Sequence, residues 1–495
     1  MSASNSGVST YARASWLFLR LLGVVYLVAF WSLSTQILGL IGHNGILPAD
    51  RLMRALTSIR GLERFWIFPT LTWISVSDSS LRLLCGGGMV LSLFLIAGLL
   101  PILVVPLLWL FYLSLSVVGQ DFLSYQWDAL LLETGFLAIF LSPLTVREKP
   151  TEVSNPPRVI VWLFLWLLFR LMVGSGVVKL ASGDPTWHSL TALSYHFETQ
   201  PIPTPVAWYA AHLPTWLLKF FTALTLVIEI GAPFLIPTTR RLRELAFLLL
   251  AGLQFVIALT GNYAFFNVLS AGLCLFLLDD VSLGRWTRLG ISEVFPPHWR
   301  KVVGIGVAVV TVPLSAAAFA GSLGIALPIA PLVNPVVDDV ASFRSVNVYG
   351  LFAVMTTTRP EIVVEGSDDG TNWLEYEFKY KAGDLHRRPP WAAPHQPRLD
   401  WQMWFAALGR FEEERWFQDF CARLLENDNE VLSLIARNPF PAHAPKYLRA
   451  LLYRYRFSAA EARRRDGVWW TRELVGGYSP VLSLQDRQES GASAR

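Results

Sequence analysis

The sequence predicts an all-α polytopic membrane bundle of about eight or nine spanning helices, followed by a mixed α/β or β-rich extramembrane domain. Of the 495 residues, 53% are hydrophobic and only 16% are charged, whereas soluble proteins carry about a quarter charged residues. Most of the chain before residue 328 consists of long apolar runs, and no such run follows it. We therefore expect a transmembrane domain over residues 1–327 and an extramembrane domain over residues 328–484.

Nine apolar runs predict the spanning helices, since a span needs roughly 20 mostly apolar residues. They cover residues 16–40, 83–100, 102–118, 125–141, 159–179, 213–236, 245–260, 265–278 and 302–327. Several runs are short, so one or two of them could be re-entrant rather than spanning. The Gly86-Gly87-Gly88 stretch in the second run would allow another helix to approach closely.

Basic residues gather in alternate loops and predict the orientation, because cytoplasmic loops carry an excess of Lys and Arg. They follow the fourth, sixth and eighth runs, at Arg147, Lys149, Arg158, Arg240, Arg241, Arg243, Arg285, Arg288, Arg300 and Lys301. The amino terminus would then be cytoplasmic and the C-terminal domain exported. Four arginines in the first loop oppose this assignment, but long loops weigh less. The net charge of +4 is spread out and indicates no nucleic-acid partner.

The C-terminal domain shows strand and helix patterns. Residues 361–380 alternate between apolar and polar types around a turn at residues 367–370, which predicts a β-hairpin. Residues 401–408 and 416–425 read as amphipathic helices, and residues 447–457 as a strand or a helix. The tail, residues 485–495, is expected to be disordered.

Three ionisable residues lie within apolar runs, where an uncompensated charge costs several kcal/mol or more. They are Glu133 in the fourth run, Arg170 in the fifth and Glu229 in the sixth. Sequential spanning helices run antiparallel, so the three side chains could form one charge cluster. We expect Arg170 to pair with Glu229 or Glu133; such a pair could equally be a structural pin for the bundle.

Lys179 ends the fifth run and shares a helix face with Leu171 and Ser175. A lysine in an apolar site can lose its proton near neutral pH and act as a base. The alternative is a lysine that reaches from the helix end to the lipid headgroups.

The polar loop after Lys179 contains Asp184, Trp187, His196 and Glu198. His196 and Glu198 could serve as metal ligands or as an acid–base pair. A metal site needs three or four ligands at set spacings, which the loop lacks, so we predict no metal. We expect these groups to hydrogen-bond one another at the membrane surface.

Arginine and tryptophan are mixed in the C-terminal domain at Arg387, Arg388, Trp391 and Trp401. This composition suits recognition of a client protein. It equally suits aromatic residues seated at a membrane interface.

Five segments carry a family resemblance. They are WDALLLETGFL (127–137), RLMVGSGVVKLASGDPTWHSLTALSYHFETQPIPTP (170–205), LTGNYAFFN (259–267), residues 347–404 and NPFP (438–441). Together they resemble the lipase maturation factor family, in the form of a bacterial member. The resemblance implies a membrane protein that helps certain lipases to fold and assemble, with the C-terminal domain contacting the client. Animal members lie in the endoplasmic reticulum membrane; a bacterial one would lie in the inner membrane with that domain in the periplasm.

A fainter resemblance concerns GSGVVKLASGDPTW (174–187), which is similar to the membrane part of vitamin K-dependent γ-glutamyl carboxylases. In those enzymes a lysine acts as base in the oxygenation of the reduced quinone, and Lys179 falls on its position. An inserted Ala-Ser-Gly before Asp184 departs from the pattern.

Two functions follow. The first is a non-catalytic maturation factor without a cofactor, whose partners are membrane lipids and a client protein such as a lipase. The alternative is a membrane enzyme acting on a quinone or other lipid-soluble substrate, with Lys179 as base and Arg170, Asp184 and His196 in support.

Overall fold

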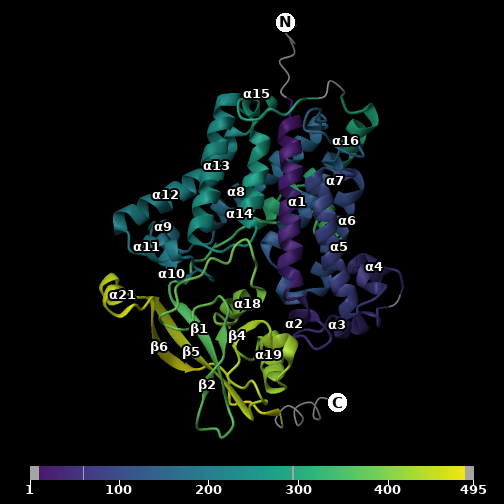
Figure 1. The fold of residues 1–495 in the computed structure, drawn as a ribbon. Coiled ribbons are helices and arrows are strands. Elements are labelled where there is room, and N and C mark those ends of the chain that lie inside the picture. Colours follow the sequence, from purple (N-terminus) through teal and green to yellow (C-terminus); the bar gives the residue numbers. More distant parts are fainter. Residues whose placement is uncertain (1–9, 60, 292–294, 485–495) are drawn as a thin grey trace.

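The computed structural model describes residues 10–59, 61–291 and 295–484. The long helices form a bundle, and the C-terminal region with the β-sheets lies against one end of it (Figure 1). Helix α15 (Asp280–Leu283) lies at the end of the bundle far from the sheets. The predicted disordered tail, residues 485–495, lies outside the described residues.

Seven helices in the described ranges are long and apolar enough to cross a membrane. They are α1 (Ala12–Ser34), α5 (Asp78–Ala97), α6 (Pro101–Val118), α8 (Arg158–Ala181), α12 (Thr215–Gly231, continued as a 3-10 helix to Leu235), α13 (Arg240–Thr260) and α16 (His298–Ser322). The predicted multi-pass helical bundle is therefore confirmed.

The other two predicted spans are also helices, but they are short. Helix α7 (Gln126–Leu141) has 16 residues and α14 (Phe266–Cys274) has 9. At 1.5 Å per residue these extend about 24 Å and about 14 Å, less than the ~30 Å hydrocarbon core of a bilayer. Both helices pack inside the bundle, against α6 and α13 respectively.

Short helices connect the long ones. Helices α2 (Ile37–Ile41), α3 (Ala49–Leu56) and α4 (Glu63–Ile67) lie between α1 and α5, at the end of the bundle near the sheets (Figure 1). Helices α9 (Pro185–His188), α10 (Leu193–Thr199) and α11 (Pro205–Ala211) form the polar loop between α8 and α12.

Helix α8 is the most buried of the seven long helices. It packs against α7, α12, α14 and α16. Its Phe164 stacks on Phe276 with ring centroids 4.7 Å apart, and Phe18 of α1 lies edge-on to Phe164 at 4.9 Å. Because α8 is central, Arg170 and Lys179 lie inside the bundle rather than in lipid, whereas Arg158 at the first position of the helix is exposed.

The C-terminal region combines small antiparallel sheets with short helices. The larger sheet has the order β2-β1-β5-β6, and β3 pairs with β4. The strands are β1 (Arg359–Ser367), β2 (Leu374–Glu375), β3 (Glu377–Phe378), β4 (Ile435–Arg437), β5 (Tyr447–Phe457) and β6 (Trp470–Gly477). The helices are α17 (Ala330–Val340), α18 (Arg398–Ala406), α19 (Arg415–Leu425), α20 (Asn429–Leu432) and α21 (Ala460–Asp466).

The expected hairpin is confirmed, since β1 pairs with β2 across the predicted turn. The helices expected over residues 401–408 and 416–425 correspond to α18 and α19, and residues 447–457 form a strand. Strand β6 was not predicted. It completes the edge of the larger sheet by pairing with β5 over residues 451–457.

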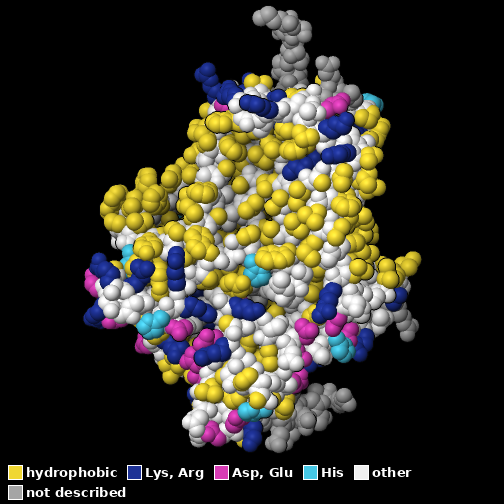
Figure 2. Space-filling model, viewed as in Figure 1, with side chains coloured by type: hydrophobic (Ala, Val, Ile, Leu, Met, Phe, Trp, Pro, Cys, Tyr) yellow, Lys and Arg dark blue, Asp and Glu magenta, His cyan; other side chains and the backbone are white. Residues whose placement is uncertain are grey.

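The surface agrees with a bundle that lies in a membrane. Figure 2 shows hydrophobic side chains over most of the helical part, whereas charged side chains gather on the C-terminal region and at the opposite end of the bundle. Exposed apolar residues recur along α13 and α16, for example Leu248, Phe255, Ile305 and Val309. Such a continuous apolar band is expected where lipid replaces water.

Candidate functional site

Arg170 of α8 and Glu133 of α7 form an ion pair inside the bundle, and each side chain is 3% exposed. Glu133 also accepts a hydrogen bond from the Tyr349 hydroxyl at 2.7 Å and one from the Asn347 backbone N–H at 3.1 Å. Arg170 donates to the Asn347 carbonyl oxygen at 3.0 Å. The pair therefore holds residues 347–349, which lie between α17 and β1, against two helices of the bundle.

Lys179 of α8 pairs with Glu229 of α12. Its Nζ lies 2.8 and 2.7 Å from the two carboxylate oxygens and 3.1 Å from the Ser175 carbonyl oxygen. All three ammonium hydrogens thus have an acceptor. The expectation that Lys179 reaches the headgroups is wrong, because its side chain is only 6% exposed.

The expected cluster of Glu133, Arg170 and Glu229 is therefore divided into two separate pairs. Of the two partners considered for Arg170, Glu133 is right and Glu229 is wrong. Arg170 and Lys179 are nine residues apart on α8, which separates the pairs by about 13.5 Å along the helix axis.

Three residues of the polar loop bind the C-terminal region. Asp184 accepts a hydrogen bond from the Met355 N–H at 2.6 Å. Trp187 Nε1 donates to the Phe352 carbonyl oxygen at 3.0 Å, and Glu198 accepts from the Phe457 N–H at 2.8 Å. The expectation that the loop groups hydrogen-bond one another holds for Asp184, which also accepts from the N–H and the hydroxyl of Thr186, both at 2.6 Å. The contacts with backbone more than 160 residues away were not expected.

His196 lies in the same loop, on α10. Its Nε2 is 3.2 Å from the Tyr263 hydroxyl, which donates to Gln200 Oε1 at 2.8 Å. Burial lowers the pKa of His196 to about 4, and the positive charge of Lys179 acts in the same direction. The imidazole is therefore neutral at pH 7. Across the described ranges, no three His, Cys, Asp or Glu side chains are grouped so as to hold a metal ion.

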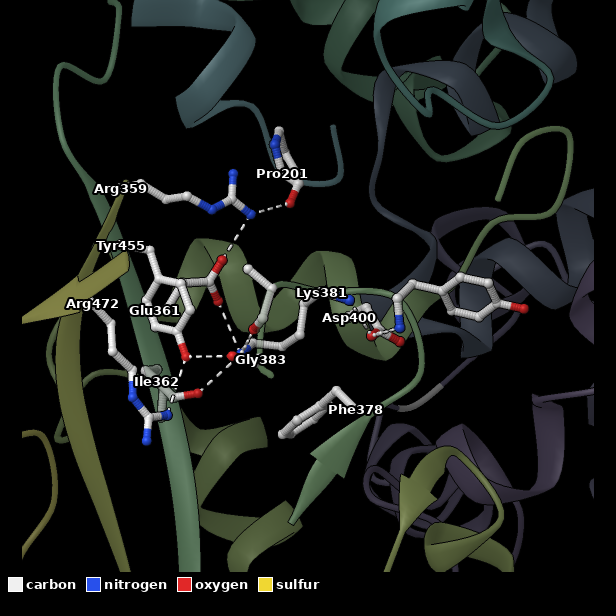
Figure 3. Close-up of polar contacts among 12 residues, drawn as sticks. Pro201, Arg359, Glu361, Ile362, Phe378, Lys381, Gly383, Asp400, Tyr455 and Arg472 are labelled. Atoms are coloured by element: carbon white, nitrogen blue, oxygen red, sulfur yellow. Dashed lines mark hydrogen bonds and ion pairs between the residues drawn. The ribbon is translucent and has the colours of Figure 1, made fainter. Parts of the chain in front are cut away.

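Arg359, at the start of β1, ties the sheet to this loop (Figure 3). Its guanidinium donates to the carbonyl oxygens of Glu198, Gln200 and Pro201 at 2.7, 2.5 and 2.8 Å. Glu361 balances its charge at 2.7 Å and also pairs with Lys381 at 2.9 Å. All three charged side chains are at most 4% exposed, so they form a buried ionic network between the sheet and the bundle.

Arg398, at the start of α18, makes a second buried link. Its two Nη atoms bind the two Asp128 carboxylate oxygens of α7 at 2.9 and 2.8 Å. Tyr112 of α6 donates to the same carboxylate at 2.5 Å. Sequence reasoning singled out neither Arg359 nor Arg398 as a site residue. The available signal was that each arginine is the first residue of a largely buried element, where a charged side chain needs a buried partner.

An aromatic groove opens where the bundle meets α18 and α19. We define this junction groove as a cavity of about 720 Å³ lined by Tyr125, Trp127, Trp401, Trp404, Phe405 and Trp416, with residues 350–354 as one wall and residues 413–415 at its rim. Trp127 and Trp401 pack edge to face with ring centroids 4.7 Å apart. Phe405 is 41% exposed, so the groove offers apolar surface to a partner.

The Arg and Trp residues predicted for client recognition have different surroundings. Trp401 lines the junction groove, but Trp391 lies outside its lining and is exposed. Arg387 donates to the carbonyl oxygens of Phe378 and Lys381 within the domain. Arg388 lies over the Trp469 ring, 5.9 Å from its centroid. The structure therefore brings only Trp401 of the four to the groove.

Both halves of the chain match family descriptions. Residues 13–285 match the lipase maturation factor transmembrane domain, and residues 345–480 match the lipase maturation factor C-terminal domain. Lipase maturation factor 2 of Gallus gallus is 38% identical over 97% of this chain and 82% of that protein. Lipase maturation factor 1 of Homo sapiens is 36% identical over 94% of this chain and 87% of that protein.

The carboxylase-like alternative receives no support from these comparisons, since the matching families and relatives are lipase maturation factors. No solved structure matches the chain.

Proposed function

Because the chain belongs to the lipase maturation factor family, we propose that it is a non-catalytic membrane factor that assists the folding and assembly of a secreted lipase. The relatives that are similar over nearly the whole chain are named lipase maturation factors. The junction groove is the observation that supports a binding role most directly, because it presents aromatic surface beside the membrane.

The groove would hold an apolar segment of the incompletely folded client. Aromatic side chains in a concave site supply large contact areas at low conformational cost. Glu413 and Arg415 at its rim are exposed and Glu414 is partly exposed, so the bound segment would carry an apolar core with polar flanks. A folded lipase keeps such segments inside, and the groove would release it.

The proposal includes an orientation and a compartment. The basic residues at the starts of α13 and α16 lie at the end of the bundle opposite the sheets (Figure 1). The excess of Lys and Arg on the cytoplasmic side supports an exported C-terminal domain. We place the domain boundary between residues 327 and 328, and the chain in a bacterial inner membrane with that domain in the periplasm.

The test is a photo-crosslinking residue at Phe405 in cells that express a secreted lipase dependent on this chain. We expect a crosslink to the lipase before it is secreted. Leu474 on β6 is the matched control position, because it is 56% exposed and lies outside the groove.

A second experiment compares the yield of active secreted lipase between cells with the groove variant Phe405→Glu and cells with the control variant Leu474→Glu. We expect the groove variant to lower the yield of active secreted lipase while the control leaves it unchanged, at equal amounts of both variants in the membrane. Equal lipase yields, together with no crosslink at residue 405, would remove the groove from the proposal.

A further inference from the structure

A second cavity lies inside the helical bundle, and its volume is about 540 Å³. Residues of α8, α10, α12, α13 and α14 line it, and most of them are apolar. Tyr263, Leu351 and Phe352 separate it from the junction groove, since they line both. We call it the bundle cavity. Its volume falls within the range of about 300–1,000 Å³ that is usual for small-molecule sites.

The bundle cavity opens sideways between α12 and α13. Large apolar lining residues of both helices also lie on the outer surface: Phe221 and Leu224 of α12, and Leu248 and Val256 of α13, with exposed fractions between 36% and 66%. Both helices are long and apolar enough to span a membrane. The opening therefore faces the hydrocarbon, and its occupant comes from the bilayer.

Two buried amides inside the bundle cavity keep free hydrogen-bonding capacity. Gln254 and Asn267 are 5% and 4% exposed, and they share one hydrogen bond of 2.9 Å. In that bond Asn267 Nδ2 donates to Gln254 Oε1. Among the described residues, the only hydrogen-bond acceptor near Gln254 Nε2 is the weak acceptor Met172 Sδ at 3.9 Å, and Asn267 Oδ1 accepts no hydrogen bond. Whichever way the two amides are turned, donors and an acceptor remain for a ligand. Buried polar groups are normally satisfied.

The charges that line the cavity cancel. Lys179 and Glu229 both line it, and they neutralise each other through the contacts described above. A ligand with a charged headgroup would add an unpaired charge in a low-dielectric site, which is unfavourable. The cavity therefore favours a neutral headgroup.

We propose that the bundle cavity binds one neutral acylglycerol taken from the membrane, such as a diacylglycerol. Its free hydroxyl donates to the open acceptor of the amide pair, and its ester carbonyls accept from the open donors. The acyl chains lie along the apolar walls and leave through the opening between α12 and α13. An oxidised quinone has carbonyl acceptors but no hydroxyl donor, so it would leave the acceptor unsatisfied. This lipid-binding site is separate from the junction groove that would bind the client.

Gly252 offers a direct way to block the opening. It lines the bundle cavity on α13, one helical turn from Leu248 and from Val256, and a Cβ added there would meet no atom within 4 Å. Gly306 on α16 is the matched control, because its Cβ would also meet no atom within 4 Å and it does not line the cavity.

The experiment incubates the purified full-length chain in detergent with a photoactivatable diacylglycerol and measures labelling by mass spectrometry. We expect Gly252→Phe to reduce labelling roughly tenfold and Gly306→Phe to leave it unchanged. Gln254→Leu with Asn267→Leu should also reduce labelling about tenfold, the effect of one or two lost buried hydrogen bonds. Thermal unfolding of every variant identifies any that has lost its fold.

Competition between the photoactivatable diacylglycerol and unlabelled lipids identifies the class of ligand. Unlabelled diacylglycerol should displace the probe, whereas phosphatidylglycerol and an isoprenoid quinone should not. Equal labelling of the Gly252→Phe and Gly306→Phe proteins would overturn the site. Displacement by the phospholipid or the quinone as effective as that by diacylglycerol would overturn the assignment to a neutral acylglycerol. Neither result depends on lipase maturation, so it leaves the proposed function standing.

Discussion

Arg398 and Asp128 form a two-point ion pair between α18 of the C-terminal region and α7 of the bundle, and the two side chains are 1% and 0% exposed. The residues are 270 positions apart in the chain. With Arg170–Glu133 and the Arg359 network, this pair fastens the C-terminal region to the helices at several buried points. The junction groove between the two parts therefore has firmly held walls.

Removal of one partner of this pair should destabilise the protein strongly. Asp128→Ala leaves the Arg398 guanidinium buried without its counter-charge, which costs about 3–5 kcal/mol. We expect a clear fall in the midpoint of thermal unfolding in detergent, measured by intrinsic tryptophan fluorescence. Asp128→Leu combined with Arg398→Met removes both charges and should unfold at a higher temperature than Asp128→Ala. A double variant no more stable than Asp128→Ala would contradict the pairing.

The pairing of Arg170 is tested by two double-mutant cycles. Glu133→Gln and Arg170→Ala should be coupled by about 1–3 kcal/mol, because each removes the same contact. Glu229→Gln and Arg170→Ala should be additive within about 0.5 kcal/mol, because Glu229 pairs with Lys179. Chemical unfolding of the wild-type protein, the three single variants and the two double variants measures both couplings. Coupling only in the second cycle would refute the observed arrangement.

The helices could be predicted from the sequence far better than the partners of the charged residues. A run of apolar residues is a local signal, and all nine predicted runs form helices. Which carboxylate faces Arg170 depends on the rotation of α7, α8 and α12 about their axes, because all three helices are apolar on most faces. Asp184, Trp187 and Glu198 found partners in backbone more than 160 residues away, and no local pattern encodes such contacts.

Stability should depend on pH through His196, which lies outside the long helices on α10. Burial lowers its pKa from 6.5 to about 4 in the folded protein, with Lys179 contributing. Between these values the unfolded chain binds more protons, so the stabilisation is complete above pH 6.5 and is lost progressively as the pH falls towards 4. The full effect is about 3 kcal/mol, because each pKa unit between the two values corresponds to about 1.4 kcal/mol.

The measurement is the thermal midpoint in detergent at a series of pH values from 7.5 to 4.5. His395 contributes in the same direction, because burial lowers its pKa to about 4 as well. We expect His196→Gln to flatten the profile in part and the double variant with His395→Gln to flatten it further. An unchanged slope in the double variant would show that neither imidazole is responsible.

The glycine stretch in α5 provides a packing test with its own internal control. A Cβ on Gly88 would lie 2.6 Å from the Phe30 ring of α1, whereas a Cβ on Gly86 would meet no atom within 4 Å. Gly88→Val should therefore push α1 and α5 apart and lower stability by about 1–3 kcal/mol, the usual effect of overpacking. Gly86→Val introduces the same side chain into the same helix two residues away and should have little effect. Thermal unfolding in detergent compares the two variants. In the double variant Gly88→Ala with Phe30→Leu, the smaller side chain at position 30 makes room for the added methyl group. This double variant should recover part of the stability that Gly88→Val loses. Equal stability of the two valine variants would mean that α1 and α5 do not approach as closely at Gly88 as the structure indicates.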